Sequence, residues 1–505
     1  MDPPRCWRGG VVTAESFFSG AAGAQARLRA ITGNVLDALE RSVAQAGPWS
    51  GQATGDLEEQ ISGIDICPDE GVGVEQVLAE VGDSVLAHGV RPWDPHCVAH
   101  LHTPPLLSSA AAELAIGVTN QSLDSFDQAP AATLLEDHLV RWLGGQLGLP
   151  DGRSGVLTSG GTASNLLGLL LARDQAAPPG WSTARDGLPP DACDWRIVTS
   201  AAAHFSVQRS AATSGLGHRA VVAVATDEQG RIDIAALDEV LADLGRRRLR
   251  TIAIVGTAGT TDLGAIDPLP ALAARAHSRG AWFHVDAAVG AGFIFSPRLA
   301  SRLAGIELAD SITADLHKLG WQPIGASSLL VRDATSFDVV RHRSDYLDRE
   351  DDADEGVLNL VSRSLDTSRR FDALKIVVSL RSTGRQQLGA MVEHLVDTTA
   401  ATGELIDATP DLELLAPPSL VTVVFRWRDP EADEEHLDWV NTEVQRRLFA
   451  TGRAVVGRTR LDGRVALKIT LLNPEVTVDD LAGLLDLVRT TATALAGAHL
   501  EVATT

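Results

Sequence analysis

The stretch TIAIVGTAGTTDLGAIDPLPALAARAHSRGAWFHVDAA (residues 251–288) decides the fold. It begins and ends with short apolar runs, TIAIVGTA (251–258) and AWFHVDAA (281–288), and a helix-prone segment lies between them. Further short apolar runs on either side of it are WRIVTS (195–200), AVVAVAT (220–226) and ASSLLVR (326–332). Alternation of apolar strands with helical segments is typical of a mainly parallel sheet that is covered by helices. We therefore predict an α/β fold for this region.

The regions on either side of this core have different patterns. Residues 1–95 combine Ala-rich, helix-prone stretches with Gly-Pro breaks, so we expect a helical N-terminal segment there. Residues 96–385 are expected to form a large α/β domain. In residues 386–505 a long helical stretch leads to the apolar runs VTVVFRW (421–427) and VALKITLLN (465–473), followed by a last helix that ends near Gly497. This order predicts a small C-terminal α+β domain.

Composition excludes several classes of function. The chain of 505 residues has a formal net charge of −23, which disfavours binding to nucleic acid or to an anionic membrane surface. Its four cysteines are far apart and form no CxxC pair, as expected in a reducing cytoplasm. The sequence contains neither a signal-peptide pattern nor an uncharged run that could span a bilayer. We therefore expect a cytoplasmic enzyme that acts on a small molecule.

The segment GVLTSGGTASNLLGLLLARD (155–174) predicts a strand, a glycine turn and a helix that starts near Thr162. The free N–H groups of such a helix start, together with the backbone of Gly161 and the hydroxyl groups of Ser159 and Thr162, could hold a phosphate group. A plain turn in which Thr162 caps the helix explains the same residues. The segment is not a Walker loop, since no Gly-Lys-Ser/Thr follows it.

Three further residues are candidates for chemistry. Asp286 ends an apolar strand, where α/β proteins place groups that contact ligands, although a structural salt bridge is an equal alternative. Lys318 lies in SITADLHKLGWQPIG (311–325), a mostly apolar setting that could confine its amine as a nucleophile, whereas most lysines are solvated surface groups. His204 follows a strand and begins a helical stretch, where it could stack on a ring or cap the helix.

These pieces occur in an order that carries a family resemblance. The sequence resembles group II pyridoxal-5′-phosphate-dependent decarboxylases of fold type I, from about His96 to the C-terminus. The motifs that carry the resemblance are TSGGTASN (158–165), HFSVQRSA (204–211), HVDAA (284–288), the pair His317-Lys318, and TSRRFDALK (367–375).

The resemblance implies a cofactor, a fold and a set of roles. The fold is that of pyridoxal-phosphate-dependent transferases, with a mainly parallel seven-stranded sheet and helices on both faces. Lys318 is implied as the covalent attachment point of pyridoxal phosphate, Asp286 as the partner of its ring nitrogen, and His204 as the residue stacked on its ring. The remaining implied cofactor contacts are Gly161 and Thr162 at the phosphate, Thr261 and Ala288 beside the ring, and His317 next to the attachment lysine. The family also implies a homodimer with its active site at the subunit interface.

The substrate class rests on residues 100–143, which look most like bacterial L-2,4-diaminobutyrate decarboxylases and related lysine or ornithine decarboxylases. In this segment Asp124 and Asp127 could bind a distal ammonium group, although a loop carboxylate or a helix cap is an equal alternative. Phe126 stands where relatives often carry Trp, so we include it as a substrate contact. An acidic or aromatic amino acid as substrate, and aminotransfer or oxidative deamination as the reaction, remain alternatives.

Tyr346 is the only tyrosine of the chain and lies in HRSDYLDREDDADEG (342–356), an acidic stretch that is typical of a mobile loop. Its position matches the loop tyrosine of glutamate decarboxylase-like relatives. The resemblance therefore implies that Tyr346 returns a proton to the α-carbon after carbon dioxide leaves. An ordinary surface tyrosine is the alternative.

Two other classes of protein are alternatives to this resemblance. A metal hydrolase could use His96, His100 and His102, since alternating histidines share one face of a strand, but no Glu-based motif such as HExxH is present. We therefore predict no bound metal. A sensor or pseudoenzyme that only binds pyridoxal phosphate is disfavoured, because the Lys318, Asp286 and His204 positions are all filled and the acidic chain carries no DNA-binding module.

Overall fold

The computed structural model describes residues 17–18, 23–43, 46–341, 347–348 and 356–503. The chain forms two compact units, one made of residues 1–97 with 446–455 and the other of residues 98–445 with 456–505. The domain boundaries that we predict at residues 95 and 385 stay predictions.

The first unit is helical, as expected for the N-terminal segment. Its helices are α1 (Ala24–Val43), α2 (Thr54–Ser62) and α3 (Val74–Ser84). Trp49 connects the N-terminal part of this unit to residues 446–455. Its ring stacks on Phe449 with ring centroids 4.5 Å apart, and its Nε1 donates a hydrogen bond to the Phe449 carbonyl oxygen at 2.6 Å.

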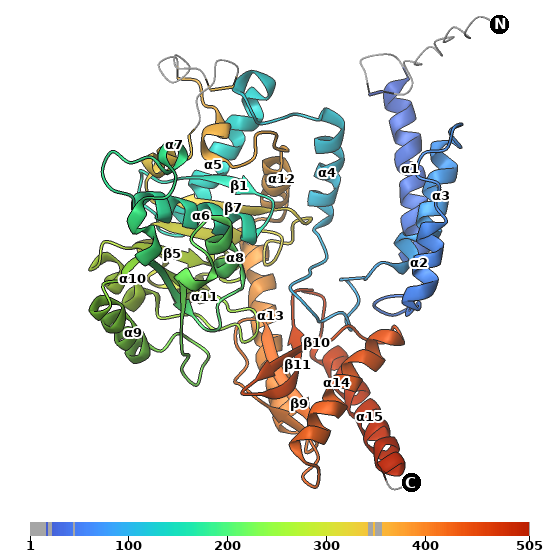
Figure 1. Cartoon of the computed structure of the whole chain (residues 1–505). Coiled ribbons are helices and arrows are strands. Elements are labelled where there is room, and N and C mark those ends of the chain that lie inside the picture. Colours follow the sequence, from blue (N-terminus) through green and yellow to red (C-terminus); the bar gives the residue numbers. More distant parts are fainter. Residues whose placement is uncertain (1–16, 19–22, 44–45, 342–346, 349–355, 504–505) are drawn as a thin grey trace, which may run out of the picture. The chain divides into compact units, whose positions relative to one another are not determined.

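The second unit contains a seven-stranded sheet with the strand order β1-β7-β6-β5-β4-β2-β3 (Figure 1). The strands are β1 (Ser154–Thr158), β2 (Trp195–Ser200), β3 (Val221–Val224), β4 (Arg250–Thr257), β5 (Trp282–Asp286), β6 (Ser311–Asp315) and β7 (Ser327–Val331). The pairs from β6 through β5, β4 and β2 to β3 are parallel, whereas β7 is antiparallel to both β6 and β1. The predicted mainly parallel, seven-stranded sheet is therefore confirmed.

Helices cover both faces of this sheet. Phe283 and His284 are neighbours on β5, so their side chains point to opposite faces. On one face a Cβ at Gly168 of α6 (Gly161–Gln175) would lie 2.8 Å from the His284 ring. On the other face Leu272 of α10 (Leu269–His277) and Phe283 both lie next to Gly256 of β4. This two-sided burial explains why the strands read as continuous apolar runs.

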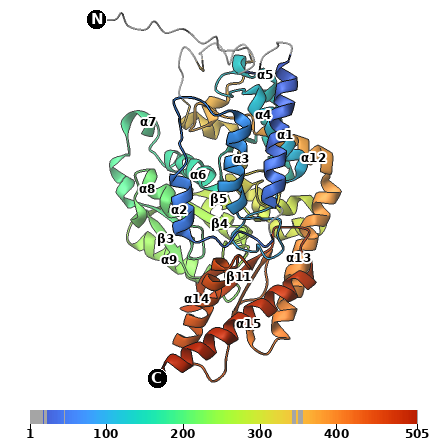
Figure 2. The same cartoon turned by 90° about the vertical axis from the view of Figure 1, so that its right-hand side faces the viewer.

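Other helices of the second unit are α4 (Leu107–Thr119), α5 (Pro130–Gln146), α7 (Thr183–Asp186), α8 (Ser206–Thr213), α9 (Ile234–Arg246), α11 (Pro297–Ala300) and α12 (Ala373–Thr383). Figure 2 shows the seven-stranded sheet and its helices from a second direction. None of the helices in the described ranges is long and apolar enough to cross a membrane.

The C-terminal part has the predicted α+β character. Its four strands, in the order β10-β11-β9-β8, are all paired antiparallel. They are β8 (Leu412–Leu414), β9 (Thr422–Trp427), β10 (Gly457–Leu461) and β11 (Arg464–Thr470), and the helices are α13 (Arg385–Asp407), α14 (Glu434–Ala450) and α15 (Val478–Ala503). Helix α15 continues past Gly497, where we expected it to end. That glycine meets no steric barrier in the helix, since nothing lies within 4 Å of a Cβ built there.

Candidate active site

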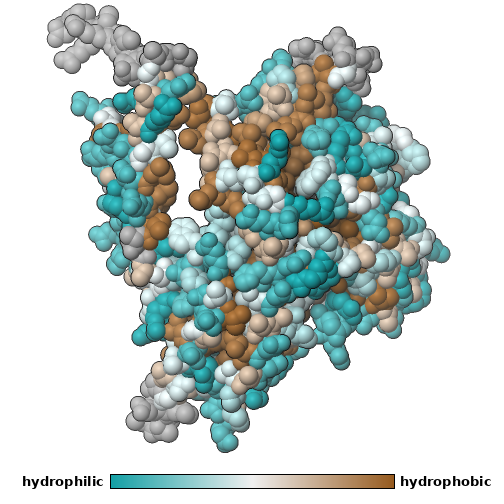
Figure 3. Space-filling model, turned by 180° about the vertical axis from the view of Figure 1, so that it is seen from behind, coloured by the Kyte–Doolittle hydropathy of each residue, from teal (hydrophilic) through white to brown (hydrophobic). Residues whose placement is uncertain are grey.

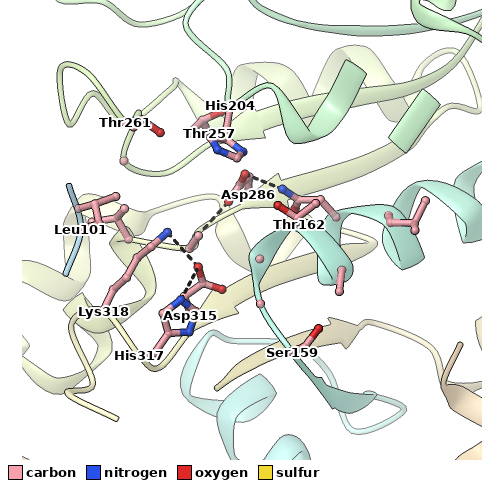
Figure 4. Close-up of a pocket in the computed structure, with 18 residues that line it drawn as sticks. Leu101, Ser159, Thr162, His204, Thr257, Thr261, Asp286, Asp315, His317 and Lys318 are labelled. Atoms are coloured by element: carbon pink, nitrogen blue, oxygen red, sulfur yellow. Dashed lines mark hydrogen bonds and ion pairs between the residues drawn. The ribbon is translucent and has the colours of Figure 1, made fainter. Parts of the chain in front are cut away.

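A cavity of about 620 Å³ lies at the carboxyl ends of β4, β5 and β6, beside the start of α6. This is the edge at which α/β sheets bind ligands. All eight residues that the sequence predicts in the cofactor site line this cavity: Gly161, Thr162, His204, Thr261, Asp286, Ala288, His317 and Lys318 (Figure 4). The structure therefore brings these side chains together, and their individual roles stay predictions.

Asp286 presents a buried, oriented carboxylate at the end of β5. Asp286 is only 6% exposed. Oδ1 accepts a hydrogen bond from the backbone N–H of Ala288 at 3.1 Å, and Oδ2 accepts one from Nδ2 of Asn165 at 2.8 Å (Figure 4). These two hydrogen bonds fix the orientation of the carboxylate, which can therefore pair with a cationic group in the cavity.

Lys318 lies in the connection between β6 and β7. Its Nζ is 2.9 Å from Oδ2 of Asp315, which ends β6 (Figure 4). His317 accompanies it, with Nδ1 donating to the Ala326 carbonyl oxygen at 2.9 Å and Nε2 3.6 Å from Oδ2 of Asp315. The amine is therefore confined at the sheet edge, as the apolar setting of its motif predicted.

Helix α6 starts at Gly161, so its first N–H groups have no partner within the helix and are available to a ligand. A Cβ at Gly161 would lie 2.9 Å from Oδ2 and 3.0 Å from Oδ1 of Asp315. Only glycine fits this position without displacing the carboxylate. A Cβ at Gly160 would meet nothing within 4 Å, so the turn leaves open space in front of the helix.

His204 stands just before α8 and faces the cavity. Its Nδ1 is 2.9 Å from Oγ of Ser206 and accepts a hydrogen bond from the Ser206 backbone N–H at 3.3 Å. Desolvation lowers the pKa of His204 below its ordinary value, although Asp286 acts in the opposite direction. A neutral imidazole whose Nδ1 is engaged can present Nε2–H to the cavity.

Thr261 belongs to a loop that is held in place by a residue of the four-stranded C-terminal sheet. Its carbonyl oxygen accepts a hydrogen bond from Nζ of Lys468 at 3.1 Å, and the same amine lies 2.7 Å from Oδ1 of Asp262. Lys468 comes from β11, so the four-stranded sheet holds a wall of the cavity.

The predicted substrate contacts are placed elsewhere. Asp124, Phe126 and Asp127 do not line this cavity. The Asp124 carboxylate accepts a hydrogen bond from Ser122, and Oδ1 of Asp127 accepts one from Oγ of Ser125 at 2.6 Å. Both bonds join side chains two residues apart, and neither carboxylate caps a helix through them. Tyr346 lies outside the described residues.

Sequence reasoning missed two cavity residues, Asp315 and Asn165. Asp315 carries the same signal as Asp286, since it is an aspartate at the end of an apolar strand, and that signal could have found it. Asn165 is the last residue of TSGGTASN and is followed by the apolar helical run LLGLLLA (166–172). Its side chain is an amide, and the residue is only 1% exposed. A buried amide in an apolar helix indicates a specific partner.

The strand on which the metal alternative depends is absent from the structure. Residues 99–106 form no strand, and His100 has a positive φ of 65°, so the shared strand face that this alternative requires of His100 and His102 is not formed. In the described ranges no group of three or more His, Cys, Asp or Glu side chains is arranged to hold a metal ion.

The groups that surround the cavity fit pyridoxal phosphate. An amine for its aldehyde comes from Lys318, and a buried carboxylate for its ring nitrogen comes from Asp286. The start of α6 and the hydroxyl groups of Ser159 and Thr162 offer donors for its phosphate. The imidazole of His204 offers a flat surface for its ring.

Comparison with known proteins agrees with this chemistry. Residues 65–428 match the pyridoxal-dependent decarboxylase conserved domain. L-2,4-diaminobutyrate decarboxylase of Acinetobacter baumannii is 40% identical over 85% of this chain and 86% of its own length. The enzyme of the same name from Rhizobium meliloti (strain 1021) is 41% identical over 91% of this chain and 90% of its own.

A solved structure extends the agreement to three dimensions. The glutamate decarboxylase domain of diaminobutyrate-pyruvate transaminase and L-2,4-diaminobutyrate decarboxylase from Vibrio parahaemolyticus superposes with a TM-score of 0.87 at 38% identity. The match covers 95% of this chain and 98% of that one. From the cavity, the family match and these relatives we conclude that the chain belongs to the pyridoxal-dependent decarboxylases and is a pyridoxal-phosphate-dependent amino-acid decarboxylase.

Proposed function

We propose that this enzyme decarboxylates a diamino acid, with L-2,4-diaminobutyrate as the first candidate and ornithine and lysine as the next. The names of the two relatives at 40% and 41% identity support the first candidate. The observation that carries the chemistry is the cavity itself, where the Lys318 amine and the buried Asp286 carboxylate converge.

The proposed roles follow from the groups that line the cavity. Bound pyridoxal phosphate supplies an aldehyde that reacts with amines and a cationic ring that accepts the electron pair left by departing carbon dioxide. Lys318 would be the covalent attachment point, because its amine lines the cavity. Asp286 keeps the ring nitrogen protonated. His204 covers one face of the ring, and its Nε2–H can donate to the substrate carboxylate.

The remaining lining residues hold and orient the cofactor. Gly161 and Thr162 offer hydrogen-bond donors to the phosphate at the start of α6. Thr261 and Ala288 flank the ring, and His317, fixed by its bond to the Ala326 carbonyl oxygen, stands beside the attachment lysine.

We assign the last proton transfer to Tyr346, whose phenol group can act as a general acid toward the α-carbon. Sequence position alone supports this role. A proton delivered to the α-carbon completes the amine product, whereas a carbon left without its proton is open to oxidation.

A diamino acid brings a distal ammonium group that needs an acceptor. The carboxylates among the described lining residues are Asp286 and Asp315, and both are engaged, by Asn165 and Ala288 in one case and by Lys318 in the other. Because Asp124, Asp127 and the intervening Phe126 lie outside the cavity lining of their own chain, we propose that they reach the substrate from the second subunit of a homodimer.

Exposed apolar side chains support the homodimer. Leu107 is 89% exposed, Ile324 68%, Leu134 55% and Leu114 45%. Figure 3 shows apolar side chains gathered over parts of one face of the molecule. Such surface usually marks a contact with another protein. The cysteines of the described ranges, Cys67, Cys97 and Cys193, are unpaired, which suits the reducing cytoplasm in which we propose that the enzyme works.

A substrate panel tests the proposal. The purified holoenzyme is given 2,4-diaminobutyrate, ornithine, lysine, glutamate, aspartate and an aromatic amino acid, and both carbon dioxide and the organic product are measured. We expect the highest kcat/KM for 2,4-diaminobutyrate, with the amine as product. A preference for an acidic or aromatic substrate would contradict the proposed substrate class, and an aldehyde or oxoacid product would contradict the proposed reaction.

A further inference from the structure

A continuous chain of hydrogen bonds runs behind the cavity and ends on the Asp286 carboxylate. Nε1 of Trp282 donates to Oγ of Ser311 at 2.7 Å, and that hydroxyl is 2.8 Å from Nδ1 of His284. Nε2 of His284 is 2.9 Å from Oδ1 of Asn165, whose Nδ2 donates to Oδ2 of Asp286 at 2.8 Å. The chain thus links strand β5 to helix α6 and back to the end of β5.

The direction of this chain is fixed at its Asp286 end. A carboxylate oxygen accepts, so the Asn165 amide turns its Nδ2 toward Asp286 and its Oδ1 toward His284. Oδ1 can only accept, so neutral His284 carries its proton on Nε2 and donates it to Asn165. Nδ1 of His284 is then an acceptor and takes the hydrogen of the Ser311 hydroxyl, which itself accepts from Nε1 of Trp282.

The second hydrogen of the same amide reaches His204. Nδ2 of Asn165 also donates to Oγ of Ser206 at 2.9 Å. The Ser206 hydroxyl then has its hydrogen free for Nδ1 of His204, 2.9 Å away. The Ser206 backbone N–H, which can only donate, also points to that nitrogen at 3.3 Å and independently marks Nδ1 as an acceptor. One amide is therefore connected both to Asp286 and to His204.

The surroundings hold Asn165 in this position. Asn165 is 1% exposed, while Ser206 and His284 are 0% exposed. A Cβ at Gly168, one helical turn after Asn165, would lie 2.8 Å from Cε1 of His284, so the helix and the imidazole are in close contact. Loss of either amide hydrogen would leave a buried acceptor without its donor, which is costly in such a closed space.

We propose that Asn165 is a positioning residue for catalysis: its single amide aims the Asp286 carboxylate at the cofactor ring nitrogen and fixes the His204 tautomer that presents Nε2–H to the substrate. This inference rests on the roles of Asp286 and His204 in the proposed function. Helix α6, which starts at the phosphate turn, would therefore also align the two side chains that contact the ring.

The decisive test measures the protonation of the cofactor ring rather than turnover. Cofactor-free wild type and Asn165→Leu are loaded with pyridoxal phosphate labelled with nitrogen-15 in the ring, and the nitrogen chemical shift and the cofactor affinity are recorded. Asn165→Leu keeps the approximate size of the side chain and removes both N–H donors without adding a charge. We expect the ring signal to move toward the deprotonated position and the affinity to fall roughly tenfold.

Further variants separate this inference from the function on which it rests. Asn165→Ala serves if Asn165→Leu does not fold, as judged by its thermal transition without cofactor. In Asp286→Ala the ring signal must move. If it does not, the proposed role of Asp286 itself fails. If it moves in Asp286→Ala but stays at the wild-type position in the Asn165 variants, the assignment of Asn165 is overturned.

Two single-oxygen deletions complete the design. Ser206→Ala removes the hydroxyl that joins Asn165 to His204 and leaves on Nδ1 only the longer backbone N–H contact of 3.3 Å. We therefore expect the nitrogen-15 signals of the His204 imidazole to move while the cofactor ring signal stays. Ser164→Ala is the matched control. Ser164 lies on α6 and is 0% exposed, like Ser206, but its hydroxyl contacts Thr158 and Ser327 instead. It should leave both signals unchanged. An unaltered His204 in Ser206→Ala would overturn the tautomer half of the inference.

Discussion

Nζ of Lys318 lies 2.9 Å from Oδ2 of Asp315, the residue that ends strand β6. Asp315 is 5% exposed, and within the described part of the chain its other oxygen, Oδ1, has no hydrogen-bond partner. The carboxylate therefore acts mainly as the counterion of the lysine. It holds the amine inside the cavity, where the aldehyde of the cofactor would have to reach it.

This geometry predicts a single attachment point among the lysines of the chain. The others are Lys375, which is 0% exposed and paired with Glu113 at 2.6 Å, and Lys468, which is paired with Asp262 at 2.7 Å. Borohydride reduction of the holoenzyme followed by peptide mapping should place the label on Lys318, and Lys318→Ala should lose it. A label on Lys375 or Lys468 would disprove the assignment.

Asp286 is predicted to matter more for rate than for cofactor binding. Replacement by Ala removes the charge that keeps the ring nitrogen protonated, and a neutral ring is a poor acceptor of electrons. We expect kcat to fall by roughly a hundredfold or more, the scale seen when one electrostatic group is removed from an active site. Cofactor should still bind, more weakly, through Lys318 and the start of α6. Near-normal turnover in Asp286→Ala would indicate a purely structural carboxylate.

The sequence predicts those parts of the site that depend on one segment at a time. Strand ends and their following turns are visible in local patterns and made Asp286 and Lys318 candidates, and the family resemblance selected them. Gly161 and Thr162 were found because a glycine turn before an apolar helix is equally local. The carboxyl ends of parallel strands then meet at one edge, so the topology itself brings these segments together.

Pairings between distant segments could not be predicted in this way. Asn165 and Asp286 are 121 residues apart, and their hydrogen bond depends on the position of α6 along the sheet. The same limit applies to Lys468, whose contact with the Thr261 loop joins segments 207 residues apart. The strand that the metal alternative required through His100 and His102 is absent, and alternation alone does not reveal the positive φ at His100.

Tyr346→Phe should change the product more than the consumption of substrate. The variant keeps the ring but loses the hydroxyl group that we assign to protonation of the α-carbon. Amine yield should fall and aldehyde should rise in air, since an unprotonated carbon can react with oxygen. Comparison of aerobic and anaerobic product mixtures checks this. Wild-type amine yield without aldehyde would assign the proton to another group, such as His204 or Lys318.

Asp124 offers a test of the proposed subunit arrangement. Asp124→Asn should raise KM for 2,4-diaminobutyrate, because the amide cannot neutralise the distal ammonium group, with little change in thermal stability. Hybrid dimers of Lys318→Ala and Asp124→Asn protomers then discriminate between the two locations. If Asp124 serves the partner's cavity, one site of the hybrid keeps both Lys318 and Asp124, and activity returns on mixing. Failure of the hybrid to regain activity would place Asp124 in the cavity of its own chain or outside the site altogether.

His284 should make the stability of the cofactor-free protein depend on pH. Burial lowers the pKa of His284 from 6.5 to about 4. Between these values the unfolded chain binds a proton that the folded chain does not. The free energy of unfolding should therefore be highest above pH 6.5 and fall toward pH 4, by on the order of 3 kcal/mol. His284→Gln keeps an amide donor for Asn165 but cannot titrate, so its urea-unfolding free energy should fall less steeply over the same pH range. Parallel pH profiles for the two proteins would contradict the lowered pKa of His284.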